Sequence, residues 1–85
     1  MTLMEIDRAM SAEAVALGAL IRPMLAGHHS FVQGAALADL VAIWIVGHLV
    51  EGDPAATAAL RAELMARHSK AVADLVPINA HLIDG

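Results

Sequence analysis

The sequence predicts an all-α fold, a bundle of three antiparallel helices that forms a single helical domain over residues 1–85. Residues with high helix propensity dominate the chain, and runs of β-branched residues are short. Three segments each begin with a helix-start signal, and only short turns separate them. Because short turns join helices that pack side by side in opposite directions, we expect an antiparallel bundle.

The first helix is predicted over about residues 3–26. Thr2 is followed three residues later by Glu5, the spacing of a capping box. Pro23 predicts a kink or a stop in the last turn, and Gly27 is a suitable C-terminal stop. One face of this helix is apolar, formed by Leu3, Ile6, Met10, Leu17, Leu20 and Met24.

The central helix is predicted over about residues 31–50, or 30–50 with its cap, because Ser30 and Gln33 have the spacing of a second capping box. This segment is very apolar. Its only polar side chains after Phe31 are those of Gln33, Asp39 and His48. A helix that is apolar on all sides is either buried or spans a membrane.

The third helix has the clearest start, with Asp53 as its cap and Pro54 in the first helical position. We expect it to run over about residues 54–76 and to stop at Pro77. The remaining residues, 77–85, are predicted to form a short apolar tail that folds back on the bundle.

The third helix is predicted to have one wet face and two packing faces. Glu63 with Arg67, and Lys70 with Asp74, are opposite charges four residues apart, so they form pairs on the solvent side. A second face carries leucines. A third carries small side chains at steps of three and four, which lets another helix approach closely.

The predicted assembly is a homodimer. The chain is 59% hydrophobic and 16% charged, whereas a domain of this length buries only roughly 60–65% of its surface. Two flanking helices cannot cover the central one, so a second copy with two-fold symmetry, or a larger protein assembly, is expected to do so. The predicted interface consists of Leu37, Leu40, Ile43, Trp44, Ala55, Ala59, Ala62 and Ala66.

Three polar residues, Asp39, Arg61 and His68, are predicted to be buried. Asp39 lies among apolar neighbours, and a buried carboxylate must be paired or protonated. We expect an ion pair with Arg61 or Arg22; an exposed edge position and a ligand-binding role are the alternatives. His68 lies on an apolar arc and is expected to be a core or rim histidine, with a pH-sensitive contact as the alternative.

The five histidines do not have the spacing of a known metal site, and the chain has no Cys. Only His28, His29 and His81, with Asp84 nearby, can be brought together in one chain of this topology. We expect these to be solvated turn and tail histidines, so no metal and no cofactor is predicted.

The composition also excludes several function classes. A net charge of −4 with scattered basic residues argues against nucleic-acid binding. No phosphate loop, nucleophile–base pair or paired carboxylates are recognisable, so no enzyme is predicted. The chain has no Cys, and its first residues lack the basic start and apolar run of a signal peptide, so we expect a cytoplasmic protein.

The predicted function is therefore a non-enzymatic helical module for protein–protein interaction or oligomerisation, as in a small accessory or regulatory protein. Two alternatives stay open. The central helix could be a single membrane span, although Gly34–Val50 is short for this and Asp39 inside it is costly. The chain could also bind a small ligand or a metal in a helical cavity.

Overall fold

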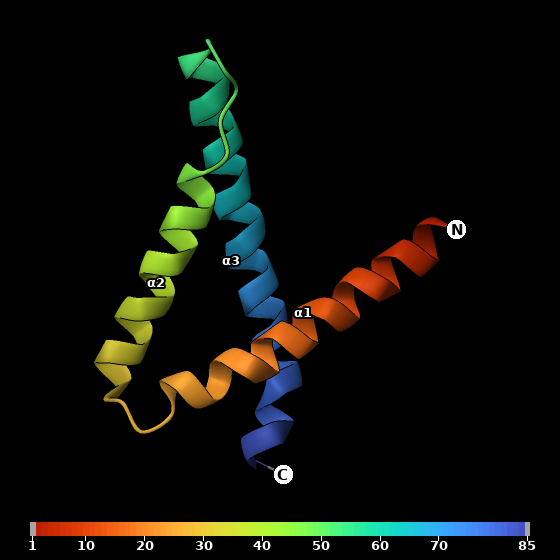
Figure 1. The fold of residues 1–85 in the computed structure, drawn as a ribbon, viewed down its shortest axis with the longest axis vertical. Helices are drawn as coiled ribbons and strands as arrows, with labels where there is room; N and C mark the ends of the chain where they lie inside the picture. Colours follow the sequence, from red (N-terminus) through yellow and green to blue (C-terminus); the bar gives the residue numbers. More distant parts are fainter. Residues whose placement is uncertain (1, 85) are drawn as a thin grey trace. The chain divides into compact units, whose positions relative to one another are not determined.

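The computed structural model describes residues 2–84. These residues form three α-helices and no β-strand (Figure 1), which confirms the predicted all-α class. The helices, in chain order, are α1 (Leu3–Leu25), α2 (Ser30–Val46) and α3 (Pro54–Asp84).

The chain divides into two compact units, Met1–Ala36 and Leu37–Gly85. The first unit contains α1 and the first turns of α2. The second contains the rest of α2, a connecting loop and α3. The predicted single domain stays a prediction.

In the first unit, α1 begins with the predicted capping box. The Glu5 N–H donates to Thr2 Oγ1, and the Thr2 N–H donates to Glu5 Oε2, each at 3.2 Å. Two of the four N–H groups that a helix start leaves unpaired are thereby satisfied. Pro23 lies inside the last turn, and the helix ends at Leu25. Gly27 follows with φ 84°, a left-handed conformation that glycine adopts without steric cost.

The second predicted capping box, Ser30 with Gln33, is wrong. Ser30 is the first residue of α2, not its cap. His29 takes that place, since its Nδ1 accepts a hydrogen bond from the Phe31 N–H at 3.0 Å. An imidazole nitrogen that carries no proton is a suitable acceptor here, because a helix start leaves such N–H groups unpaired.

The Gln33 side chain forms its hydrogen bonds with the end of α1 and the turn after it, not with the start of α2. Its Nε2 donates to the carbonyl oxygen of Leu25 at 2.8 Å and to that of His28 at 2.9 Å. Both carbonyls lie at or beyond the end of α1, where no further helical turn supplies donors. Gln33 therefore fixes the turn between α1 and α2 instead of closing a capping box.

In the second unit, α2 ends at Val46, four residues before the predicted end at about residue 50. The Gly47 N–H still bonds the carbonyl of Ile43 at 3.0 Å, but the His48 N–H bonds that of Ile45, which is the tighter spacing found at helix ends. The apolar sequence Leu49–Val50 predicted continued helix, yet it lies in the loop that follows α2.

Side chains from α3 bind the loop and explain the early end of α2. Arg61 donates through Nη2 to the carbonyl of Val46 at 2.9 Å and through Nε to that of His48 at 3.1 Å. Thr57 Oγ1 accepts from the Val50 N–H at 2.9 Å and donates to the Val50 carbonyl at 3.1 Å. These bonds replace the helical partners that the loop residues give up.

The start of α3 is as predicted, and its end is not. Asp53 Oδ1 accepts from the Ala56 N–H at 2.9 Å, and Pro54 is the first helical residue. Pro77 lies inside the helix, which continues to Asp84. The predicted tail 77–85 is therefore wrong for the described residues, and Gly85 lies outside them. A proline removes a single helical hydrogen bond, and the residues after it favour helix strongly enough to continue.

The second half of α2 and α3 form an antiparallel helical hairpin. Val46 is linked to Arg61, and Trp44 lies against His68, so the paired positions move in opposite directions along the chain. Away from the connecting loop the two helices diverge (Figure 1). No residue in the described part of the chain is buried.

Candidate interaction groove

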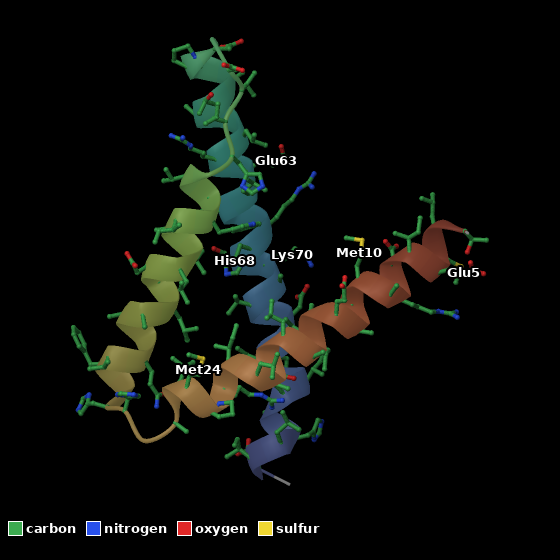
Figure 2. The ribbon with its side chains drawn as sticks, viewed as in Figure 1. Glu5, Met10, Met24, Glu63, His68 and Lys70 are labelled. Carbon is green, nitrogen blue, oxygen red and sulfur yellow. The ribbon has the colours of Figure 1, made fainter. Side chains whose placement is uncertain are left out.

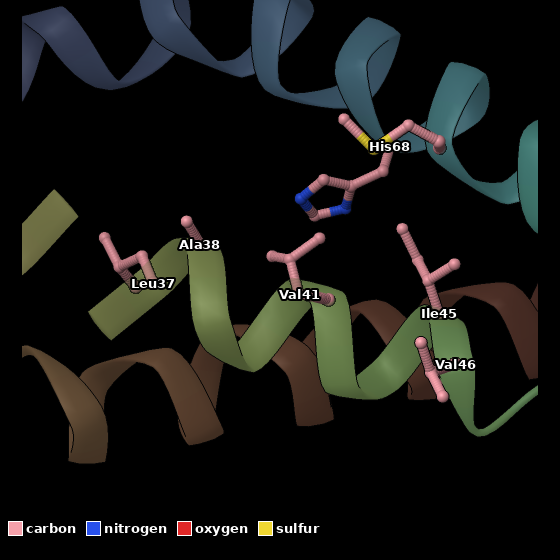
Figure 3. A pocket seen from close by; sticks show the side chains of 8 residues that line it. Leu37, Ala38, Val41, Ile45, Val46 and His68 are labelled. Carbon is pink, nitrogen blue, oxygen red and sulfur yellow. The ribbon is translucent and has the colours of Figure 1, made fainter. Parts of the chain in front are cut away.

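The hairpin of the second unit contains an apolar groove between α2 and α3, with a volume of about 530 Å³ (Figure 3). Six of its lining residues come from α2 and two from α3. His68 is the one titratable side chain among them. The lining residues are Leu37, Ala38, Val41, Ala42, Ile45, Val46, Met65 and His68.

The groove follows from side-chain size at facing positions. Ala38 and Ala42 lie one turn apart on α2, and an alanine side chain leaves much of the space between two helices unfilled. Met65 and His68, one turn apart on α3, line the opposite wall. Figure 3 shows the His68 ring extending from α3 toward Val41. The walls thus meet through a few long side chains and leave the space beside them open.

Trp44 lies between two histidines at one end of this region. Its ring centroid is 5.7 Å from that of His68, with the planes at 51°, and 5.4 Å from that of His48, with the planes at 75°. His48 Nδ1 also donates to the Trp44 carbonyl at 2.8 Å. Trp44 is the only tryptophan of the chain, and 44% of it is exposed.

The three polar residues predicted to be buried occupy different environments. His68 and Arg61 are half-buried, whereas Asp39 is exposed. The predicted ion pair between Asp39 and Arg61 is not formed, because the Arg61 guanidinium bonds to carbonyls of the connecting loop. Asp39 thus lies at an exposed position, which is one of the alternatives expected for it.

The predicted wet face of α3 is confirmed. Arg67 Nη2 lies 2.6 Å from Glu63 Oε1, and Lys70 Nζ lies 2.7 Å from Asp74 Oδ2. Figure 2 shows Glu63 and Lys70 on the side of α3 away from α2, and His68 on the side that faces it. The charged side of α3 is therefore separate from the groove.

The predicted interface residues are accessible in the single chain. Leu37 lines the groove, while Leu40 and Ile43 are 55% and 62% exposed. The small side chains of α3 are exposed as well, namely Ala55, Ala59, Ala62 and Ala66. Whether another chain covers these residues stays a prediction.

Of the candidate metal ligands, His28 and His29 belong to the first unit and His81 to the second, so the structure of either unit does not test this cluster. Within residues 2–84, no three His, Asp or Glu side chains are grouped closely enough to hold an ion. His29 is occupied as the cap of α2, which orients its Nδ1 toward the Phe31 N–H. This local role of His29 was not predicted from the sequence.

Sequence reasoning also missed two features of the hairpin. Periodicity identified the apolar faces, but it did not show that Val41, Ile45 and Met65 line an open groove, because this depends on how far the helices diverge. Thr57 was missed as well. Its bonds to Val50 cross the loop, seven residues along the chain, and no local pattern indicates such a contact.

No helix within residues 2–84 combines the length and the apolar character that a membrane crossing requires. Comparison with known proteins found no matching family model, no matching curated protein and no matching solved structure.

Proposed function

We propose that this chain is a non-enzymatic helical module that self-associates through α2, as a two-fold homodimer in which each copy has its three helices in an antiparallel bundle. One observation carries the proposal. The most apolar helix of the chain presents large side chains to solvent on several sides, and its hairpin partner α3 covers only one of them.

The energetics favour covering this surface. Moving a Leu or Ile side chain from water into an apolar contact contributes about 1.5–3 kcal/mol. Leu40, Ile43 and Trp44 all lie on α2 and are each about half exposed or more. Because a two-fold interface uses each patch twice, even this small set provides a substantial driving force for pairing.

The test is the molar mass of the full chain in solution, measured by light scattering and by sedimentation at micromolar concentration. We expect a dimer for the wild type and a monomer for Ile43→Glu. The substituted residue is 62% exposed in the single chain, so the new carboxylate is solvated in the monomer and has to be desolvated only in the dimer.

Val76→Glu is the matched control, because Val76 on α3 is also 62% exposed and is likewise replaced by a carboxylate. We expect it to remain dimeric, and both variants should keep the helical circular dichroism of the wild type. A wild-type chain that is folded and monomeric over this concentration range would refute self-association.

A small apolar ligand is a second candidate occupant of this region. The groove volume of about 530 Å³ lies within the range of ligand sites, roughly 300–1,000 Å³. Native mass spectrometry of the purified protein separates the two candidates. A mass of one chain plus a stoichiometric small molecule supports ligand binding, and a mass of two chains supports the dimer.

A further inference from the structure

The groove between α2 and α3 has the size of a small-molecule site and is too small for another helix. Its lining positions on α2 run from Leu37 to Val46, which is about 13 Å along the helix axis. A helix with its side chains is about 10–12 Å wide, so this length of helix occupies on the order of 1,000 Å³. The groove provides about 530 Å³. A partner helix therefore does not fit between α2 and α3, whereas a small molecule does.

The walls of the groove favour an aliphatic ligand. Methyl, methylene and thioether groups of residues such as Val41, Ile45 and Met65 surround most of the space. Contact with these groups is favourable in proportion to the apolar ligand surface that it removes from water. The unbranched Met65 side chain can also adapt to the outline of a flexible alkyl chain.

No charged residue within the described part of the chain lines the groove. The charged side chains that the sequence places on the same two helices lie elsewhere. Arg61 binds carbonyls of the connecting loop, and Asp39 is exposed and does not line the groove. An ionised headgroup would leave water without a counter-ion, which costs far more free energy than the transfer of a neutral polar group. The groove thus disfavours carboxylates and amines.

His68 provides the one polar contact of the groove. Its ring nitrogens form no hydrogen bond within residues 2–84, and neither is sealed from water. A neutral imidazole has one N–H donor and one acceptor nitrogen. A ligand that displaces water from these nitrogens loses affinity unless it forms a hydrogen bond in its place. A hydroxyl group both donates and accepts, so it can bind either tautomer of His68.

We propose that the groove binds a neutral aliphatic alcohol, with its alkyl chain along Val41 and Ile45 and its hydroxyl at the His68 ring. An extended chain of about eight carbons is roughly 10 Å long, which the groove accommodates. The proposal rests on the ligand site given above as the second candidate function and names its ligand class. Self-association is not required for it.

The test titrates 1-octanol into the full chain at about pH 8, where an imidazole in water is uncharged. Sodium octanoate is the matched probe, because it has the same chain length and a charged headgroup. Chemical shifts of the Val41, Ile45 and Met65 methyl groups report binding. We expect saturable shifts with one octanol per chain, and binding of octanoate that is weaker by about tenfold or more.

Two variants locate the ligand in the groove. Ala42→Phe fills part of the groove and should weaken octanol binding by about tenfold or more. Ala73→Phe is its matched control, because Ala73 is exposed on α3 and does not line the groove, and it should bind octanol as the wild type does. His68→Leu keeps an apolar side chain but removes both nitrogens, so we expect octanol affinity to fall about three- to tenfold.

The comparison of the two probes uses the wild-type protein and does not depend on a variant folding. The proposal is refuted if octanol does not bind saturably, if octanoate binds equally well, or if Ala42→Phe or His68→Leu binds octanol as the wild type does. A different small molecule retained by the purified protein, without octanol binding, would refute the alcohol class and leave the ligand site standing. A dimer without octanol binding would refute the proposal and leave self-association standing.

Discussion

The Arg61 side chain acts as a C-terminal cap for α2, although it belongs to α3. The last turn of any helix leaves carbonyl groups without donors, and the aligned peptide dipoles give that end a partial negative charge. The guanidinium supplies two N–H donors and a positive charge at this position. A single residue therefore ends α2, holds the loop and joins the two helices of the hairpin.

Replacement of this cap should destabilise the second unit. Arg61→Met keeps the aliphatic stem but removes both hydrogen bonds, and we expect a loss of about 1–2 kcal/mol in the free energy of unfolding. Arg67→Met is the control, since it breaks only a solvent-exposed pair within α3, for which about 0.3–0.5 kcal/mol is expected. Urea unfolding followed by circular dichroism measures both. Equal losses in the two variants would mean that the cap contributes nothing beyond a surface charge.

Individual residues were the least predictable part of this molecule. The sequence favoured an ion pair of Asp39 with Arg61 or Arg22, with an exposed position and a ligand-binding role as the alternatives. In the structure Asp39 is exposed, and the Arg61 guanidinium donates hydrogen bonds to backbone carbonyls. Backbone groups at helix ends have no sequence identity of their own, so a pattern of side-chain types cannot show that they will compete for a charged partner.

At the scale of the elements, helix starts were more predictable than helix ends. Thr2 and Asp53 cap as expected, because an N-terminal cap depends on a side chain that bonds within three residues of its own position. Ser30 failed because His29, one residue earlier, could also accept the bond. The end of α2 failed because it is fixed by residues of α3, which no local window of sequence contains.

The continuation of α3 through Pro77 makes a testable contrast between two prolines of one helix. Pro77→Ala restores a helical N–H and removes the clash of the ring with the preceding turn, which together are worth up to about 3 kcal/mol in a helix interior. We expect slower amide hydrogen exchange over Ile78–Asp84 and increased helicity.

Pro54→Ala is the matched control, because Pro54 occupies the first helical position, where its missing N–H costs nothing. We expect this variant to leave hydrogen exchange after residue 77 unchanged and to lower stability by about 0.4–1 kcal/mol, since it frees the unfolded chain. If Pro77→Ala had no effect on protection of the last turns, those turns would not be a continuous part of α3.

At the scale of the whole molecule, the composition leads to a prediction that the structure of one chain does not test. A composition that is 59% hydrophobic predicts more apolar surface than one chain can cover, and assembly with a second copy stays a prediction. The groove between α2 and α3 could not be predicted in the same way. Its existence depends on the divergence of two helices, which composition does not encode.

If the chain self-associates, its thermal stability must depend on the protein concentration. Unfolding of a dimer produces two chains, so a hundredfold rise in concentration stabilises the folded form by about 2.7 kcal/mol per dimer. We therefore expect the melting temperature of the wild type to rise by roughly 5–10 °C over this range. Differential scanning calorimetry and circular dichroism can measure the melting temperature at the lowest and highest concentrations of this range.

The same concentration series separates association from folding. Ile43→Glu should melt at a temperature that does not depend on concentration, because its folded form is a single chain. Val76→Glu should keep the wild-type dependence, since its carboxylate lies outside the proposed interface. If wild type and Ile43→Glu showed the same concentration dependence, the exposed side of α2 would not be where the copies meet. If the melting temperature of neither protein depended on concentration, the apolar surface of α2 would remain in water. The unfavourable free energy of this exposure would then have to be offset by interactions within one chain.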